Sequence, residues 1–446
     1  MAVGLIFASH AGMPETPVRA QFAGHDHTSL VGRSTQPTGP GQSAIASTLP
    51  SSGGSEREAA GLLLAFGWKE GLGGDYRWRL DRKGVRVNVY INDQFQSVVK
   101  GGSDVNGSGR NAASMDAFVT LDLHRLGLWE NADALLHLQS NWGRGVNLRV
   151  GSLAEVNDDA DGSLGLHVAQ LWYRHHVFDQ KAALMLGFLD FQTIVDRNVF
   201  ANSEDKQFWN QALDNNPLVP LNIGLGAALE IQATSWWTLN LGAGDAQSEL
   251  YETGFTSAFH NEAWFIAYAE NTLRVRWSSR RGPLAGNYRA GVIYDPRPRD
   301  IFRRSEHDTA KQGDDYGLYV SVDQKLFRET TEDEQGLGVF ARFADRTSET
   351  FRFSRFWSGG FSYAGLIPGR NKDVLGFGIA VQRAGDIYRS RINREVDSEA
   401  VYELYYAVQL TDWLVVTPDI QYIDNPGGSG GLGHAVAAGV RIRASF

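Results

Sequence analysis

Alternation of apolar and polar side chains is the dominant pattern in this chain. From residue 85 to 91, valine or isoleucine stands at every odd position, with polar residues or tyrosine between them. A period of two places successive side chains on opposite faces of a strand and cannot form a helical stripe. The pattern returns over residues 117–123 and is most regular from Leu221 to Ile231. It predicts long strands with one apolar and one polar face, and such length is unusual for a soluble strand.

Sixteen segments with this alternation predict sixteen strands. They lie near residues 84–92, 115–123, 133–140, 166–175, 182–190, 221–231, 236–244, 267–277, 286–294, 316–326, 336–344, 357–365, 374–382, 399–410, 413–423 and 434–446. An even number of strands is typical of bacterial barrels whose two termini both lie on the periplasmic side of the outer membrane.

The predicted connections alternate in length. Long links fall at Gln94–Ser114, Asn141–Gly165, Phe191–Pro220, Asp245–Ile266, Asp295–Asp315, Asp345–Phe356, Arg383–Ser398 and Asp424–Gly433. Shorter links fall between them, such as Gln232–Ser235, Arg328–Gln335, Leu366–Asp373 and Thr411–Asp412. Outer-membrane barrels have short periplasmic turns and longer external loops, whereas a soluble sandwich or propeller has no reason to keep this parity. The sequence therefore predicts an all-β fold, a transmembrane antiparallel up-and-down β-barrel of sixteen strands.

Composition narrows the class of protein further. The mean hydropathy is −0.29 and no run of about 18 apolar residues occurs, which excludes a helical membrane protein. The absence of cysteine excludes a disulfide framework and thiolate metal sites. A net charge of −9 argues against nucleic acid as a partner, because phosphate binding requires a basic face.

The N-terminal part of the chain is expected to lie outside the barrel. Met1–Ala11 contains a short apolar run without a preceding Lys or Arg, as in a truncated signal peptide or a misassigned start. Residues 1–55 are expected to form a disordered, low-complexity leader. Residues 56–83 are expected to form a short periplasmic segment that could include a helix at Glu56–Trp68, and residues 84–446 the barrel domain.

Aromatic residues gather at or near the predicted strand ends. They are Trp236, Trp237, Trp277, Trp357, Tyr402, Tyr406, Trp413 and Tyr422. Rings collect in this way at membrane interfaces, and ordinary core packing is the alternative interpretation.

The last predicted strand alternates up to Phe446. A terminal strand that ends in phenylalanine is the form in which outer-membrane barrels present their assembly signal, so Phe446 is predicted to be part of it. The strand is expected to close the barrel against residues 85–91. That pairing would place Arg441 and Arg443 beside Arg86 on the lumen wall.

Several longer stretches point to one family. They are RKGVRVNVYINDQF from Arg82, LDLHRLGLWENADALLHLQSNWG from Leu121, NVFANSEDKQFWNQALDNNPLVP from Asn198, YAGLIPGRNKDVLGFGIA from Tyr363, YELYYAVQLTDWLVVTPDIQYIDNPGG from Tyr402 and the C-terminal GVRIRASF. In these stretches the chain resembles the OprB family of carbohydrate-selective porins over roughly residues 80–446. The leader and the low-complexity stretch Ser34–Gly54 depart from the family pattern.

The resemblance implies a sixteen-stranded barrel, integral to the bacterial outer membrane, through which sugars diffuse passively. The expected partners are carbohydrate solutes, outer-membrane lipid and lipopolysaccharide, and the barrel-assembly machinery through the C-terminal strand. No cofactor and no catalytic activity are expected.

A pore needs no nucleophile, so its function lies in the lumen side chains and in the loop that narrows the channel. The longest link, Phe191–Pro220, is the candidate for that loop, because so long a loop in a compact protein usually has a function. We expect it to fold inward, and an external cap is the alternative. Its predicted constriction residues are Glu204, Asp205, Lys206, Gln207, Trp209, Asn210 and Gln211.

Alternation also directs polar strand residues into the lumen. They are Arg86, Asp122, His137, Glu230, Arg274, Arg276, Arg289, Arg342, Glu403, Gln409, Gln421, Arg441 and Arg443. An arginine facing lipid at mid-depth would cost about 2–4 kcal/mol, which favours the inward direction. Guanidinium and carboxylate groups can replace water around sugar hydroxyls, and aromatic rings offer an apolar face to the C–H surface of a pyranose. For any single arginine, a solvated wall residue is the simpler interpretation.

Other functions have weaker support in the sequence. A general or anion-preferring porin is the first alternative, because the predicted lumen holds more arginine than carboxylate. An outer-membrane hydrolase would need a serine and a histidine at one height on neighbouring strands, and no such pair is found. A polymer-export barrel has no discriminating feature. The GxGxxG pattern from Gly428 precedes a strand instead of a helix, and the histidines at 25–27 and 175–176 are not expected to bind metal.

Overall fold

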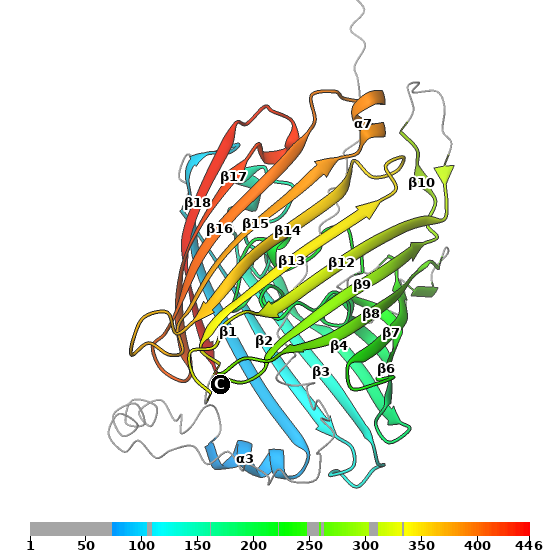
Figure 1. Cartoon of the computed structure of the whole chain (residues 1–446), viewed down its shortest axis with the longest axis vertical. Helices are drawn as coiled ribbons and strands as arrows, with labels where there is room; N and C mark the ends of the chain where they lie inside the picture. The colour runs from blue at the N-terminus through cyan, green and yellow to red at the C-terminus, as the bar shows by residue number, and fades with distance from the viewer. Residues whose placement is uncertain are drawn as a thin grey trace, which may run out of the picture.

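A computed structural model of the chain describes residues 74–104, 109–160, 162–221, 223–247, 258–259, 263–302, 311–331 and 334–446. It shows a closed barrel of sixteen antiparallel strands (Figure 1). Neighbouring strands pair in chain order, and the first strand pairs with the last to close the ring. Among the described residues, no helix is long and apolar enough to cross a membrane.

The elements have the following bounds. The wall consists of β1 (Val85–Gly101), β2 (Gly109–Asp122), β3 (Ala132–Gly143), β4 (Leu164–Val177), β5 (Ala182–Asp190), β6 (Ile223–Ile231), β7 (Trp237–Asp245), β8 (Phe265–Trp277), β9 (Leu284–Asp295), β12 (Asp315–Lys325), β13 (Gly336–Arg346), β14 (Phe353–Ala364), β15 (Val374–Ala384), β16 (Ser398–Gln409), β17 (Leu414–Asp424) and β18 (His434–Ser445). A short ribbon pairs β10 (Arg299–Asp300) with β11 (Lys311–Gln312). The helices are α3 (Gly74–Arg82), α4 (Asn147–Val150), η1 (Phe191–Thr193), α5 (Gln211–Asp214), α7 (Asp386–Arg391) and η2 (Pro426–Gly428).

All sixteen predicted strands are confirmed, and the wall shows the expected two faces. In β12, for example, Leu318 and Val320 are exposed on the outside, whereas Ser321 and Asp323 are buried inside. An apolar outer face and a polar interior are what lipid outside and a lumen inside require.

Two expectations about strand pairing are wrong in part. Most of the link Gln94–Ser114 is strand, because β1 and β2 stay paired as far as Ser97 and Gly109. The polar residues of this stretch face a polar interior, so they need no loop to reach water. The last strand does close against the first, but β18 pairs with Tyr90–Gly101, so only the end of the expected stretch 85–91 takes part.

The corrected closure separates Arg86 from the C-terminal arginines. Arg441 lies opposite Gln94 and Arg443 lies opposite Asn92, so neither is beside Arg86. Strands of a closed barrel are tilted, and the first and last strands therefore meet with a stagger that alternation alone does not specify.

The connections alternate in length between the two ends of the barrel. Short ones, such as residues 178–181, 232–236 and 410–413, lie at the end where α3 and the C-terminus are found (Figure 1). The longest connections, residues 144–163 and 191–222, leave from the opposite end. This parity fits the predicted arrangement of turns and loops.

Two long connections fold into the barrel. We call residues 144–160, which contain α4, the first inward segment, and residues 191–221, which contain η1 and α5, the second inward segment. Their apolar side chains are buried, including Val146, Val150, Val156, Phe208 and Leu213. The sequence pattern treats 141–165 as an ordinary external loop, which is wrong: its valines and acidic residues pack against the inner wall.

Candidate functional site

Short polar side chains shape the inward segments locally. The side chain of Asn147 accepts from the Asn157 N–H and donates to Glu155, both at 3.0 Å, which folds the first segment back on itself. Asn210 begins α5, where its side chain accepts from the Ala212 N–H at 3.0 Å. Such side chains satisfy main-chain donors that a non-helical, buried segment would otherwise leave without partners.

The second inward segment crosses the interior to the far wall. It connects β5 to β6, yet its middle binds β16 and β17, which lie opposite in the ring of strands. The carboxylate of Glu403 accepts from the main-chain N–H of Trp209 at 2.6 Å and of Asn210 at 3.0 Å. The Asn210 amide donates to Gln421 at 3.0 Å. These contacts hold the second inward segment across the lumen, from β5 and β6 to β16 and β17.

Three wall arginines fasten the same segment. Arg342 donates to the Leu213 carbonyl at 2.9 Å and lies 3.3 Å from the Asp196 carboxylate. Arg441 donates to the carbonyls of Glu204 and Gln207, the latter at 3.0 Å. Arg342, Arg441 and Asp196 are buried, so their charge-assisted bonds are strong and a lost partner would be costly.

The third arginine, Arg443, pairs with Asp205 at 2.8 Å, and its guanidinium lies 4.3 Å from the Tyr90 ring centroid. The Lys206 ammonium lies 6.0 Å from the same ring centroid. The Trp209 ring is 5.3 Å from the Arg441 guanidinium. The residues predicted at the constriction therefore do lie in the interior, and the structure brings most of them into one packed cluster with the β18 arginines.

The first inward segment is fastened to the wall in the same way. Ser114 on β2 donates to Asp159 at 2.7 Å, and Gln421 on β17 donates to the Val156 carbonyl at 2.8 Å. The Ser152 hydroxyl donates to Glu399 on β16 at 2.6 Å.

The two inward segments also contact each other. The Asp158 N–H donates to the Trp209 carbonyl, and the Gln211 N–H donates to the Glu155 carbonyl, each at 2.9 Å. Asn215 donates to the Asp158 carboxylate at 3.0 Å. The segments therefore behave as one packed unit that fills part of the barrel.

A different part of the wall keeps charged groups open to solvent. Arg197 of the second inward segment lies 3.7 Å from Glu230 on β6, and both side chains are 43% exposed. Arg274 on β8 is half-buried within electrostatic reach of this pair, and Arg276 beyond it is exposed. On the next strands of the wall, the buried Arg289 guanidinium of β9 pairs with the Asp323 carboxylate of β12 at 2.6 Å.

Several predicted lumen residues lie at other heights. Arg86 pairs with Asp81 of α3 at 2.9 Å, and Asp122 pairs with Arg125 in the turn after β2 at 3.2 Å. Gln409 lies at the end of β16 next to a short turn. These residues lie at the α3 end of the barrel, far along the strands from the inward segments, because alternation specifies the face but not the depth.

Sequence reasoning missed much of the acidic interior. Asp158 and Asp159 of the first segment, Asp196 and Asp214 of the second, and Glu270 on β8 are all buried in the lumen. Glu270 accepts from the Asp196 N–H and from Tyr319, both at 2.8 Å. The sequence signal for the acidic residues of the first segment is the run EVNDDAD at residues 155–161. That link was expected to be external, and carboxylates are common in external loops.

Comparison with known proteins agrees with this architecture. The sequence profile described as carbohydrate-selective porin, OprB family, matches residues 107–446. Porin B of Pseudomonas aeruginosa is 23% identical over 423 residues, which cover 85% of this chain and 91% of the relative. The putative porin QuiX of Acinetobacter baylyi is 22% identical over 428 residues, covering 85% and 93%. The high-pH structure of Pseudomonas putida OprB matches with a TM-score of 0.73 at 22% identity, covering 83% of this chain and 96% of that one.

A closed sixteen-stranded barrel with an apolar outside and a polar, partly filled interior defines a channel of the bacterial outer membrane. The chain belongs to the OprB family of carbohydrate-selective porins. It is an integral outer-membrane β-barrel, and its family and fold are those of a channel rather than an enzyme.

Proposed function

We propose that this porin carries neutral sugars by passive diffusion past Glu230 and Arg274 of the wall and Arg197 of the second inward segment, which together we call the open wall. The observation that supports this most is the division of the interior into two parts. On the β13–β18 side the charged groups are bound to the inward segments, whereas these three side chains remain accessible. A guanidinium and a carboxylate side by side offer donors and acceptors to sugar hydroxyls, and weak binding of this kind allows a solute to leave again.

The same division argues against an anion-preferring pore. The predicted excess of lumen arginine is largely neutralised, because Arg289, Arg342 and Arg443 each pair with a carboxylate. A buried, paired arginine contributes little field to a passing anion. The open wall carries both signs of charge.

The buried histidine on the inner wall is not arranged for hydrolysis. His137 lies 2.9 Å from Asp116 through one ring nitrogen and 3.3 Å from Gln170 through the other. A general base for a serine needs one nitrogen directed at the nucleophile. This histidine therefore gives no support to a catalytic role, and we propose, from the family of the chain, that it is a channel without catalytic function.

Assembly and lipid contacts belong to the same proposal. The main chains of Phe446 and Val89 exchange hydrogen bonds of 2.8 and 3.1 Å. Phe446 therefore takes part in the pairing of β1 with β18, the seam that closes the barrel. We propose that β18 with Phe446 is the strand recognised by the assembly machinery, and that the exposed apolar outer face contacts lipid and lipopolysaccharide.

Liposome swelling tests the solute specificity. Proteoliposomes should swell rapidly in glucose and more slowly in larger oligosaccharides. Arg274→Ala combined with Glu230→Gln should change the sugar rates several-fold, because both groups face the open lumen. Arg86→Ala, which removes an equally charged group near α3, is the control and should leave the rates within about twofold. Equal swelling rates for the wild type and all variants would mean that the open wall does not act on sugar passage.

A further inference from the structure

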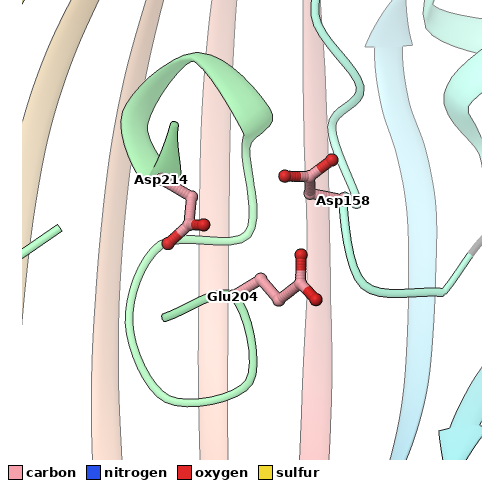
Figure 2. A group of neighbouring side chains, drawn as sticks. All are labelled: Asp158, Glu204 and Asp214. Atoms are coloured by element: carbon pink, nitrogen blue, oxygen red, sulfur yellow. The ribbon is translucent and has the colours of Figure 1, made fainter. Parts of the chain in front are cut away.

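Three acidic side chains face one another where the two inward segments meet (Figure 2). They are Asp158 of the first segment and Glu204 and Asp214 of the second. Each is buried, and one carboxylate oxygen from each lies within 4.8 Å of the other two. Three negative charges this close, away from water, are strongly unfavourable unless a positive charge joins them.

The nearby arginines act on this cluster only from a distance. Arg441 directs its guanidinium to the main-chain carbonyls of Glu204 and Gln207, and Arg342 pairs with Asp196. Both lower the pKa of Asp214 electrostatically, yet neither forms an ion pair with Asp158 or Asp214 within the described residues. The cluster thus keeps a deficit of positive charge.

Three buried carboxylate oxygens of Asp158 and Asp214 lack a protein donor at hydrogen-bonding geometry. Neither oxygen of Asp214, nor Oδ1 of Asp158, receives a hydrogen bond of ordinary geometry. The main chain of Ser203 is close enough to lower the pKa of Asp214. Asn215 donates to the other oxygen of Asp158, and the Gln211 side chain is close enough to lower the pKa of Asp158 as well. Burial nonetheless raises the pKa of Asp214 to about 7. Buried carboxylate oxygens without donors are uncommon, and a bound ion is one of the few arrangements that would satisfy them.

We propose that Asp158, Glu204 and Asp214 bind one divalent cation, with calcium preferred over magnesium. Calcium takes six to eight oxygens at about 2.3–2.6 Å in flexible geometry, so two oxygens on one ion can be about 5 Å apart. The 4.8 Å spread of the carboxylates fits that limit. Magnesium needs oxygens at about 2.0–2.1 Å, so opposite ligands are about 4 Å apart and the cluster would have to contract.

The ion would join the two inward segments inside the barrel. Its ligands come from both segments and none comes from the wall, so it would add a link to the two main-chain hydrogen bonds between them. This site is independent of which solute crosses the barrel. It would set how rigidly the segments hold the constriction.

Titration of the metal alone tests the site. The full-length protein, purified in detergent and freed of metal with EDTA, should bind one Ca²⁺ with a dissociation constant below about 1 mM. Mg²⁺ should bind at least tenfold more weakly. Tb³⁺ should occupy the same site, with luminescence sensitised by the neighbouring Trp209, and Ca²⁺ should displace it.

Two isosteric variants separate a metal site from a proton-bridged cluster. Asp158→Asn with Asp214→Asn should weaken Ca²⁺ and Tb³⁺ binding at least thirtyfold, while the new amide oxygen at position 158 can still accept the bond from Asn215. Glu230→Gln is the control: it removes one negative charge from the lumen at a residue outside the cluster, and binding should stay within about threefold. If the wild type binds no Ca²⁺ or Tb³⁺, or the double variant binds as the wild type does, the proposal is wrong.

Folding of the double variant is checked by the faster migration of unheated barrels on SDS gels. If it does not fold, the single variant Asp214→Asn replaces it, with the same expected direction. Calcium should also raise the temperature at which the unheated form of the wild type is lost. If calcium changes neither the stability nor the Tb³⁺ luminescence of the wild type, the carboxylates are neutralised by protons instead, and the proposal is wrong.

Discussion

At the scale of single residues, a few buried acidic and basic groups decide how the lumen is filled. Glu403 receives two main-chain N–H groups of the second inward segment, and no other wall residue holds this stretch by two such bonds in the described chain. A buried donor left without an acceptor costs about 1–3 kcal/mol. Glu403 is therefore the wall residue whose loss should free the segment most.

Substitution of Glu403 should release the second inward segment from β16 while the barrel stays folded. We expect Glu403→Ala to destabilise the protein by about 2 kcal/mol or more, because two buried N–H groups lose their acceptor. Glu403→Gln keeps one carbonyl acceptor and should cost less. The measurement is the thermal midpoint of the unheated gel band, with single-channel noise as a second readout. Equal midpoints for the alanine variant and wild type would contradict this role.

At the scale of elements, the wall makes room for the segment it holds. Gly378 on β15 faces Leu213 and Phe208, and a Cβ there would lie 2.7 Å from the Leu213 side chain and 3.0 Å from the Phe208 ring. Close packing of this kind leaves no space for even one methyl group. The absence of a side chain at Gly378 thus lets α5 lie against the strand.

Gly378→Ala should push the segment away from β15. Overpacking typically costs about 1–3 kcal/mol, so the thermal midpoint should fall. Gly359→Ala on the neighbouring strand β14 is the matched control, because its Cβ would have the nearest atom at 3.3 Å. If both variants behave alike, the effect comes from the strand and not from the segment.

Alternation predicted the sixteen strands because each inward and outward face is specified locally by a period of two. It could not predict the stagger at the β1–β18 seam, since the pairing of residues from opposite ends of the barrel domain is set by barrel geometry, as Tyr90 and Ser445 show. It identified the second inward segment by length. It missed the first inward segment, and with it Asp158. A polar loop that enters a polar lumen has the same composition as a loop that remains outside.

At the scale of the whole molecule, the two ends of the barrel differ in the length of their connections. Proteinase K added to intact cells should cut within residues 296–314, at the end with long connections, and not within 365–373, near α3. Permeabilised cells should be cut at both places, which is the control for accessibility. Cleavage within 365–373 in sealed cells would reverse the orientation.

In the proposed mechanism, sugars pass along the open, mixed-charge wall while Arg342, Arg441 and Arg443 hold the second inward segment. Single-channel current in a planar bilayer, recorded with and without added sugar, tests this most directly. We predict that glucose and maltooligosaccharides reduce the ionic current in a concentration-dependent way and that anion selectivity is weak. Current that is carried mainly by anions and unchanged by either sugar would contradict this claim and favour an anion porin.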